Sequence, residues 1–169
     1  MRACVTESVL ALFSAEPAAT PYQAAGSRAA ASVDPAVFLV GPENRLVIPV
    51  VQAVLDGTQP AWNPIFICGP SGSGKTHLAQ AIAAEWRRTR PRQRKAVYVT
   101  ASDFARQLAE AIEAESVDDL RNCYRTASLA IFDEVGHFRG KVAAQYELLY
   151  TIDALVAGGN RGGLISAAS

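Results

Sequence analysis

The feature that most constrains the fold is a glycine-rich octapeptide, GPSGSGKT, at residues 69–76. The four apolar residues before it, Ile65–Cys68, predict a short buried strand, and the apolar spacing after it predicts a helix over residues 76–88. Strand, loop and helix in this order are the context in which the pattern G-x-x-x-x-G-K-[ST] binds phosphate. We favour a phosphate site over a glycine turn without a ligand, because a chance match in a chain of this length is rare.

The residue types of this loop suit a polyphosphate. Small side chains let the backbone curl so that successive N–H groups face phosphate oxygens, and the following helix adds the positive end of its dipole. We expect Lys75 to reach the β and γ phosphates and the Thr76 hydroxyl to ligate Mg²⁺. The predicted nucleotide ligands are the loop residues Gly69, Pro70, Ser71, Gly72, Ser73, Gly74, Lys75 and Thr76.

A second apolar run, residues 129–132, ends in two acids, Asp133 and Glu134. In open α/β sheets, ligands bind at the carboxyl ends of the strands. We predict that Asp133 holds Mg²⁺ through its water shell and that Glu134 orients and polarises a water for attack on the γ phosphate. Solvated acids often end strands, so the pair indicates a functional site only in combination with the glycine loop. Together they favour ATP hydrolysis over a kinase, which must exclude water.

Strands and helices alternate along the chain. The predicted strands are residues 65–68, 96–99, 129–132 and 163–166. Further helices are predicted near residues 104–115 with Ser102 as N-cap, from a capping box at Ser116, and over residues 148–156 with an apolar stripe in the core. Apolar strands that alternate with helices predict an α/β fold with a parallel sheet covered on both faces.

Composition narrows the function classes. Sixteen basic and sixteen acidic residues give a formal net charge of zero, which disfavours a protein held to nucleic acid by bulk positive charge. The basic run at residues 87–95 is interpreted as a solvated loop rather than a nucleic-acid patch. No apolar run approaches the roughly 20 residues of a membrane span, so we expect no membrane partner.

The cysteines and the first residues add two expectations. Cys4, Cys68 and Cys123 are far apart and match neither a disulfide framework nor a zinc pattern, which favours a reducing, cytoplasmic location. Cys68 is expected to behave as a small buried hydrophobe. Residues 1–36 are rich in Ala, Ser and Pro and are predicted to be a disordered tail or linker.

Several stretches together resemble the central AAA+ ATPase domain of the bacterial chromosomal replication initiator, the DnaA family. The main ones are NPIFICG at residues 63–69 and, within and after the glycine loop, GKTHL at residues 74–78. Further similar positions are FLVGPEN at 38–44, VYV at 97–99, Asp119 with Leu120, Tyr124 with Arg125, Lys141 and Gln145. The resemblance covers residues 37–169, which we predict to be a partial AAA+ ATPase domain.

The resemblance implies a P-loop NTPase of the AAA+ type, with residues 69–76 as its Walker A loop and Asp133 and Glu134 as its Walker B acids. Val40 and Gly41 would lie beside the adenine. Ser166 falls at the sensor I strand, where it would touch the γ phosphate or the attacking water. The implied ligands are ATP, ADP and Mg²⁺. The implied role is a nucleotide-dependent switch in DNA replication initiation, with self-association through an arginine of the next subunit and with origin DNA as partner.

The chain also departs from the family pattern. Glu110 and Ala143 match basic positions of the family's single-strand DNA surface, so we expect that surface to lose positive charge here. Ala167 and Ala168 replace a Ser-Asp pair, and Pro49 is tolerable only in the first turn of a helix or at a kink. The family's sheet has the strand order 5-1-4-3-2, followed by a lid and a C-terminal DNA-binding domain. No residues of this sequence correspond to the last strand, the lid or that domain. We therefore expect an exposed sheet edge, marginal stability and weak nucleotide binding.

Other functions stay open at this point. GKTHLA at residues 74–79 and DEVG at residues 133–136 also resemble helicase-loader and transposition-helper ATPases. A degenerate, non-catalytic nucleotide-binding module is a second alternative, because Ala168 stands where the family has a polar residue. A small-molecule kinase is the third.

Overall fold

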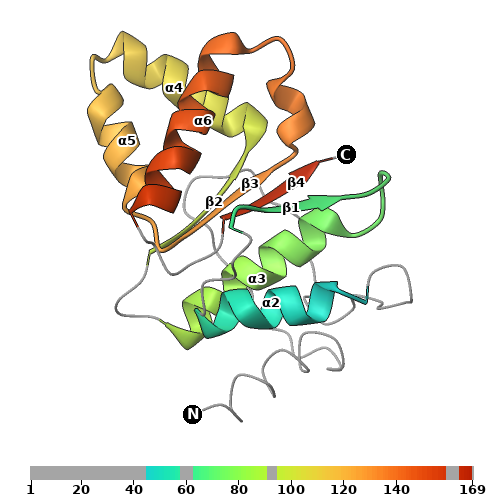
Figure 1. The fold of residues 1–169 in the computed structure, drawn as a ribbon. Coiled ribbons are helices and arrows are strands. Elements are labelled where there is room, and N and C mark those ends of the chain that lie inside the picture. The colour runs from blue at the N-terminus through green and yellow to red at the C-terminus, as the bar shows by residue number, and fades with distance from the viewer. Residues whose placement is uncertain (1–44, 58–62, 91–94, 159–163, 169) are drawn as a thin grey trace.

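The computed structural model of the chain describes residues 45–57, 63–90, 95–158 and 164–168, the last segment as backbone (Figure 1). The predicted tail over residues 1–36 and the Val40 and Gly41 positions lie outside the described residues. None of the helices in the described part of the chain is long and apolar enough to cross a membrane.

Within the described residues, four strands form one parallel sheet in the order β1-β4-β3-β2. The strands are β1 (Ile65–Cys68), β2 (Ala96–Thr100), β3 (Leu129–Asp133) and β4 (Leu164–Ala168). Each lies within two residues of its predicted bounds, and the fourth strand inserts between the first and the third, as the resemblance implies. Among the described strands β1 pairs with β4 alone, so the strand before the glycine loop lies at an edge of this sheet.

Helices cover both faces of the sheet, which confirms the α/β class. On one face α2 (Val47–Asp56) packs beside α3 (Lys75–Thr89), and on the other lie α4 (Ala101–Glu113), α5 (Val117–Arg125) and α6 (Val142–Ala157) (Figure 1). A short 3₁₀ helix, η1 (Val135–Phe138), follows β3. Pro49 is the third residue of α2, in the first turn, where a proline ring costs no helical hydrogen bond.

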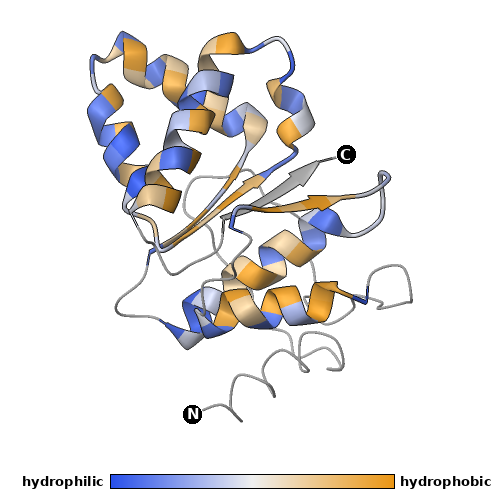
Figure 2. Ribbon diagram, in the orientation of Figure 1, coloured by the Kyte–Doolittle hydropathy of each residue, from blue (hydrophilic) through white to orange (hydrophobic). Residues whose placement is uncertain are grey.

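The alternation of side chains along β3 divides the core in two. Leu129 and Ile131 pack with α2 and α3, where Trp86 is fully buried. Ala130 and Phe132 face the other way, into a cluster with the aromatic rings of α4, α5 and η1. Successive residues of a strand point to opposite faces, so β3, which is apolar up to its last residue Asp133 (Figure 2), is buried on both.

One predicted N-cap was wrong, and a second helix begins where predicted but without its capping hydrogen bond. Thr100, not Ser102, is the N-cap of α4: its hydroxyl accepts a hydrogen bond from the Asp103 N–H at 3.2 Å and donates one to Asp103 Oδ2 at 3.0 Å. The extended backbone of β2 continues through Thr100, which leaves Ser102 exposed inside the first turn. Ser116 does occupy the N-cap position of α5, but its side chain accepts no capping hydrogen bond from the described residues.

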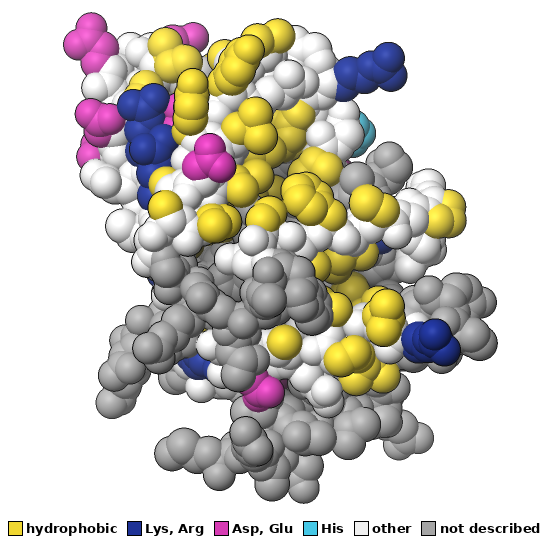
Figure 3. All heavy atoms as spheres, in the orientation of Figure 1, with side chains coloured by type: hydrophobic (Ala, Val, Ile, Leu, Met, Phe, Trp, Pro, Cys, Tyr) yellow, Lys and Arg dark blue, Asp and Glu magenta, His cyan; other side chains and the backbone are white. Residues whose placement is uncertain are grey.

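Some residues expected in the core are exposed. Cys68 lies on the face of β1 that α4, α5 and α6 do not cover, because those helices pack over β2 and β3. The helix predicted over residues 148–156 begins earlier, at Val142, and Leu155 is buried while Leu149 and Val156 are exposed. Figure 3 shows apolar side chains gathered over this part of the surface; the large exposed ones on α6 are Val142, Tyr146, Leu149, Tyr150 and Val156.

Candidate nucleotide-binding site

The glycine loop joins the edge strand β1 to the N-terminus of α3, as the motif requires. Gly72 and Gly74 have φ angles of 77° and 85°, in the left-handed region that side chains other than glycine avoid. Gly74 is the N-cap of α3, and the first intrahelical bond runs from the Leu78 N–H to its carbonyl at 2.9 Å. The N–H groups of the first turn of a helix have no intrahelical acceptor, so this turn presents donors to an anion.

The side chain of Lys75 lies against the earlier residues of the glycine loop. Its Nζ donates hydrogen bonds to the carbonyl oxygens of Gly69 and Pro70, both at 2.8 Å, and contacts Ser73 Oγ at 3.4 Å. The ammonium group therefore lies inside the curl of the loop, where a phosphate group of a nucleotide would place its oxygens. These carbonyl contacts can be exchanged for phosphate contacts by a small rotation of a flexible side chain.

The two acids after β3 have different environments. Asp133 is 1% exposed, and each of its carboxylate oxygens accepts one hydrogen bond: Oδ1 from the Glu134 N–H and Oδ2 from the Tyr98 hydroxyl, both at 2.8 Å. The side chain of Glu134 is 44% exposed, and its Oε2 lies 3.5 Å from His137 Nδ1. Glu134 has a φ of 55°, so the chain turns sharply after the strand and directs the second acid away from the first. A buried acid with two hydrogen bonds and a half-exposed acid suit two different roles.

The register of the sheet brings the loop and Asp133 to the same edge. Phe132 pairs with Ser166, and Ser166 pairs with Phe66, so Asp133 lies level with Ile67, just before the loop. All strands are parallel, so their carboxyl ends meet at this edge, which is where ligands bind in open α/β sheets. One strand, β4, separates the two segments.

Two side-chain hydrogen bonds connect α3 to Asp133 through the Tyr98 hydroxyl. Gln80 Nε2 contacts the Tyr98 hydroxyl at 3.4 Å, and that hydroxyl donates to Asp133. Gln80 lies one helical turn after Thr76, on the same side of α3. The helix that carries the predicted Thr76 ligand packs against the strand that carries the predicted Asp133 ligand, and Gln80 and Tyr98 connect the two elements.

The donor set at this site fits Mg²⁺. A buried carboxylate is normally paired with a cation, yet within the described part of the chain no lysine or arginine forms an ion pair with Asp133. Mg²⁺ prefers oxygen ligands, keeps several waters, and is usually held by one or two protein groups together with the phosphates. Thr76 and Asp133 are such groups.

The remaining predicted site residues are placed less completely. Ser166 lies on β4 between the two segments of the site, by its backbone register. Val40 and Gly41 lie outside the described residues, so the adenine side stays a prediction. Tyr98 and Gln80, which contact this site, were not predicted from the sequence. The sequence signal for Tyr98 is its hydroxyl, a polar group in the otherwise apolar strand predicted at residues 96–99. Burial, and then the hydrogen bond to Asp133, raise its pKa well above the ordinary value.

A family model for the bacterial DnaA ATPase domain matches residues 34–167 of the chain. The chain belongs to this family. Replication initiator DnaA proteins of Thermomicrobium roseum and Aquifex aeolicus are 39% and 36% identical to it over 124 and 118 residues. These alignments cover 73% and 70% of the chain but only 26% and 29% of the relatives, so the chain spans about a quarter of their length.

Solved DnaA structures share the fold. AMPPCP-bound DnaA from Aquifex aeolicus matches with a TM-score of 0.69 and 32% identity, over 78% of this chain and 40% of that one. Domain III of the Thermotoga maritima initiator matches with a TM-score of 0.66 and 28% identity, over 78% and 53%. A DnaC helicase loader matches with a TM-score of 0.61 over 76% of this chain and 71% of that one, but at 15% identity, which is a likeness of fold alone. The resemblance and the fold class predicted from the sequence are thereby confirmed.

Proposed function

We propose that this DnaA-family domain binds ATP and ADP with Mg²⁺ between the glycine loop and Asp133, and that it acts as a nucleotide-dependent switch in replication initiation. One observation carries the proposal: the loop, the N-terminus of α3 and a buried carboxylate with no cationic partner among the described side chains share one edge of the sheet, joined by Gln80 and Tyr98. A related DnaA structure contains AMPPCP, an ATP analogue, which supports a nucleotide as the ligand.

The binding step follows from the charges at the site. The amides of the loop and of the first turn of α3, together with the Lys75 ammonium, offset the negative charge of the triphosphate. The Thr76 hydroxyl and the Asp133 carboxylate would hold Mg²⁺, which would supply positive charge to offset that of the phosphates.

We further propose that the domain hydrolyses ATP. Glu134 is the residue that can accept a proton from water, because its carboxylate is half-exposed and has only the long contact to His137 among the described residues. Ser166 is proposed to touch the γ phosphate or the water from the adjoining strand. Self-association through an arginine of a neighbouring subunit and a cytoplasmic location belong to the same proposal, since an initiator acts on the chromosome.

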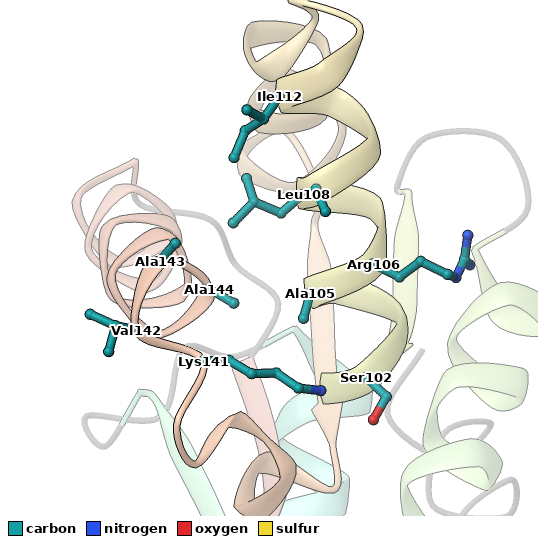
Figure 4. A pocket seen from close by; sticks show the side chains of 10 residues that line it. Ser102, Ala105, Arg106, Leu108, Ile112, Lys141, Val142, Ala143 and Ala144 are labelled. Carbon is teal, nitrogen blue, oxygen red and sulfur yellow. The ribbon is translucent and has the colours of Figure 1, made fainter.

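DNA contact is a separate part of the proposal, suggested by the related DnaA structure that contains single-stranded DNA. A groove of about 480 Å³ lies between α4 and the start of α6 (Figure 4). It is lined mainly by apolar side chains, and its basic residues are Arg106 and Lys141. Arg106 bonds Glu110 at 2.7 Å and Asp103 at 3.3 Å, and Ala143 adds no charge. We therefore propose that this domain alone binds single-stranded DNA weakly.

The test separates binding from turnover. The affinity of a fluorescent ATP analogue and the release of phosphate from ATP are measured with Mg²⁺ for the wild type, Lys75→Ala and Glu134→Gln. We expect Lys75→Ala to lose affinity, and Glu134→Gln to keep affinity but to lose turnover by about 10²-fold or more. Tight binding without turnover in the wild type would support the non-catalytic module instead, and the absence of binding would refute the proposed site.

A further inference from the structure

Tyr98 touches the predicted metal ligand from a neighbouring strand. On β2 it pairs with Ile131, while Thr100 pairs with Asp133, so the tyrosine ring reaches forward by two residues along the sheet. Its hydroxyl lies 2.8 Å from Asp133 Oδ2. An ionised carboxylate can only accept hydrogen bonds, so the hydroxyl is the donor.

This bond and a backbone bond together fix the orientation of the carboxylate. Oδ2 accepts from Tyr98 and Oδ1 accepts from the Glu134 N–H, so each oxygen has one donor and keeps further lone-pair capacity. One donor lies on β2 and the other is the backbone amide just after β3, so the buried carboxylate is held from two directions. Groups that hold a metal ligand in this way are as much a part of a metal site as the ligands themselves.

The same hydroxyl also contacts the helix of the other predicted ligand. It accepts from Gln80 Nε2 at 3.4 Å, and Gln80 lies one turn beyond Thr76 on α3. Tyr98 therefore connects the strand with Asp133 and the helix with Thr76, and it limits the distance between the two groups.

We propose that Tyr98 is a positioning residue that holds the Asp133 carboxylate in the orientation that receives Mg²⁺, an inference that rests on the proposed nucleotide site. The alternative is that Tyr98 is an ordinary core tyrosine whose hydroxyl is hydrogen-bonded but does not orient the Asp133 carboxylate. Tyr124 is the matched case of that alternative, because it is buried in the other core cluster and its hydroxyl donates to Gln107 Oε1 at 2.7 Å.

The experiment compares Tyr98→Phe with Tyr124→Phe in the full chain. Each change deletes one hydroxyl and keeps the ring. Binding of a fluorescent ATP analogue is measured in EDTA and during a Mg²⁺ titration, and thermal melting is recorded for each variant. We expect Tyr98→Phe to raise by about ten-fold the Mg²⁺ concentration that gives half of the full change in nucleotide affinity, as for other groups that support a metal ligand. The nucleotide affinity measured in EDTA should be unchanged. Tyr124→Phe should leave the Mg²⁺ dependence as in the wild type.

The outcomes distinguish this inference from the proposed function. A wild type whose ATP binding responds to Mg²⁺, with Tyr98→Phe shifting the titration no more than Tyr124→Phe, would overturn the inference alone. Equal losses of affinity in EDTA and in Mg²⁺ would also overturn it. A wild type that binds no ATP would overturn the proposed function and the inference with it. If Tyr98→Phe fails to melt cooperatively, Gln80→Ala takes its place, and a smaller rise of the Mg²⁺ midpoint is then expected; no rise would overturn the inference.

Discussion

Glu147 offers a prediction whose magnitude the structure sets. Its carboxylate, 8% exposed, joins α6 to α5 through two arginines. Arg121 donates from Nε to Oε1 at 3.0 Å and from Nη2 to Oε2 at 2.9 Å, and Arg125 Nη2 donates to Oε1 at 2.9 Å. The change Glu147→Gln keeps the shape, removes the charge, and turns an amide N–H₂ group toward a guanidinium.

The expected loss follows from these contacts. Hydrogen bonds to charged groups contribute roughly 1.5–3 kcal/mol when buried, and breaking a buried pair costs about 3–5 kcal/mol. The side chains of Arg121 and Arg125 are 38% and 31% exposed, so water replaces part of what they lose. We therefore expect Glu147→Gln to lower the free energy of unfolding by about 2 kcal/mol. For a chain of this size that shifts the melting temperature by roughly 4–8 °C.

Thermal melting followed by circular dichroism measures this loss, with Glu110→Gln as the control. Glu110 is also bonded to an arginine, Arg106 at 2.7 Å, but its side chain is 60% exposed and the pair is one helical turn apart. Such a surface pair contributes about 0.5 kcal/mol or less. Equal shifts for the two variants would refute the argument that burial makes the Glu147 contacts matter.

The pH dependence gives a second check on the same residue. The hydrogen bonds and charges of Arg121 and then Arg125 hold the pKa of Glu147 below its ordinary value. A lowered carboxyl pKa stabilises the fold above the unfolded-state value, and this contribution disappears as the pH falls through the folded-state value. The difference between wild type and Glu147→Gln should therefore be constant near neutral pH and shrink below about pH 4. A difference that persists undiminished into that acid range would contradict the assignment.

Three further predictions follow from the caps, the site and the groove. Thr100→Ala should lower the free energy of unfolding by about 1 kcal/mol through the lost cap of α4, whereas Ser102→Ala should leave it nearly unchanged in chemical denaturation. Mg-ATP at a hundred times its dissociation constant should stabilise the domain by about 2.7 kcal/mol, visible as a rise in melting temperature that Lys75→Ala abolishes at the same concentration. Single-stranded DNA affinity should fall only gently with salt, with a slope near that of one or two released counterions rather than several, because Lys141 is the groove cation without an acidic partner among the described residues.

The sequence was sufficient for those parts of the fold that depend on local patterns. The strand at Ile65–Cys68, the helix after Gly74 and the buried ring of Trp86 each follow from a short periodic segment. The loop and Asp133 could be placed at one edge because parallel strands share their carboxyl ends. No contact between distant residues was needed for these steps.

Other features depend on contacts that no local pattern contains. Cys68 is apolar and follows three apolar residues, yet its exposure depends on which strands the helices of the second layer cover. The bond from Tyr98 to Asp133 joins residues 35 positions apart and requires β2 and β3 to pair in a specific register. The N-cap of α4 differs from the predicted one by two positions, because β2 extends to Thr100 and both Thr100 and Ser102 can cap a helix.

The burial of Asp133 connects the stability of the domain to its ligand. A carboxylate that is 1% exposed, held by two neutral donors and without a cation among the described side chains, carries a desolvation cost, and we expect the two hydrogen bonds to offset only part of it. A divalent cation bound with a nucleotide would supply the missing opposite charge, so its binding would stabilise the fold beyond the contacts that the nucleotide makes itself. By the same reasoning Asp133→Asn should raise the stability of the ligand-free domain and weaken its response to Mg-ATP. Thermal melting with and without Mg-ATP measures both, and an Asn variant that is less stable without ligand would show that Tyr98 and the Glu134 N–H alone offset the buried charge.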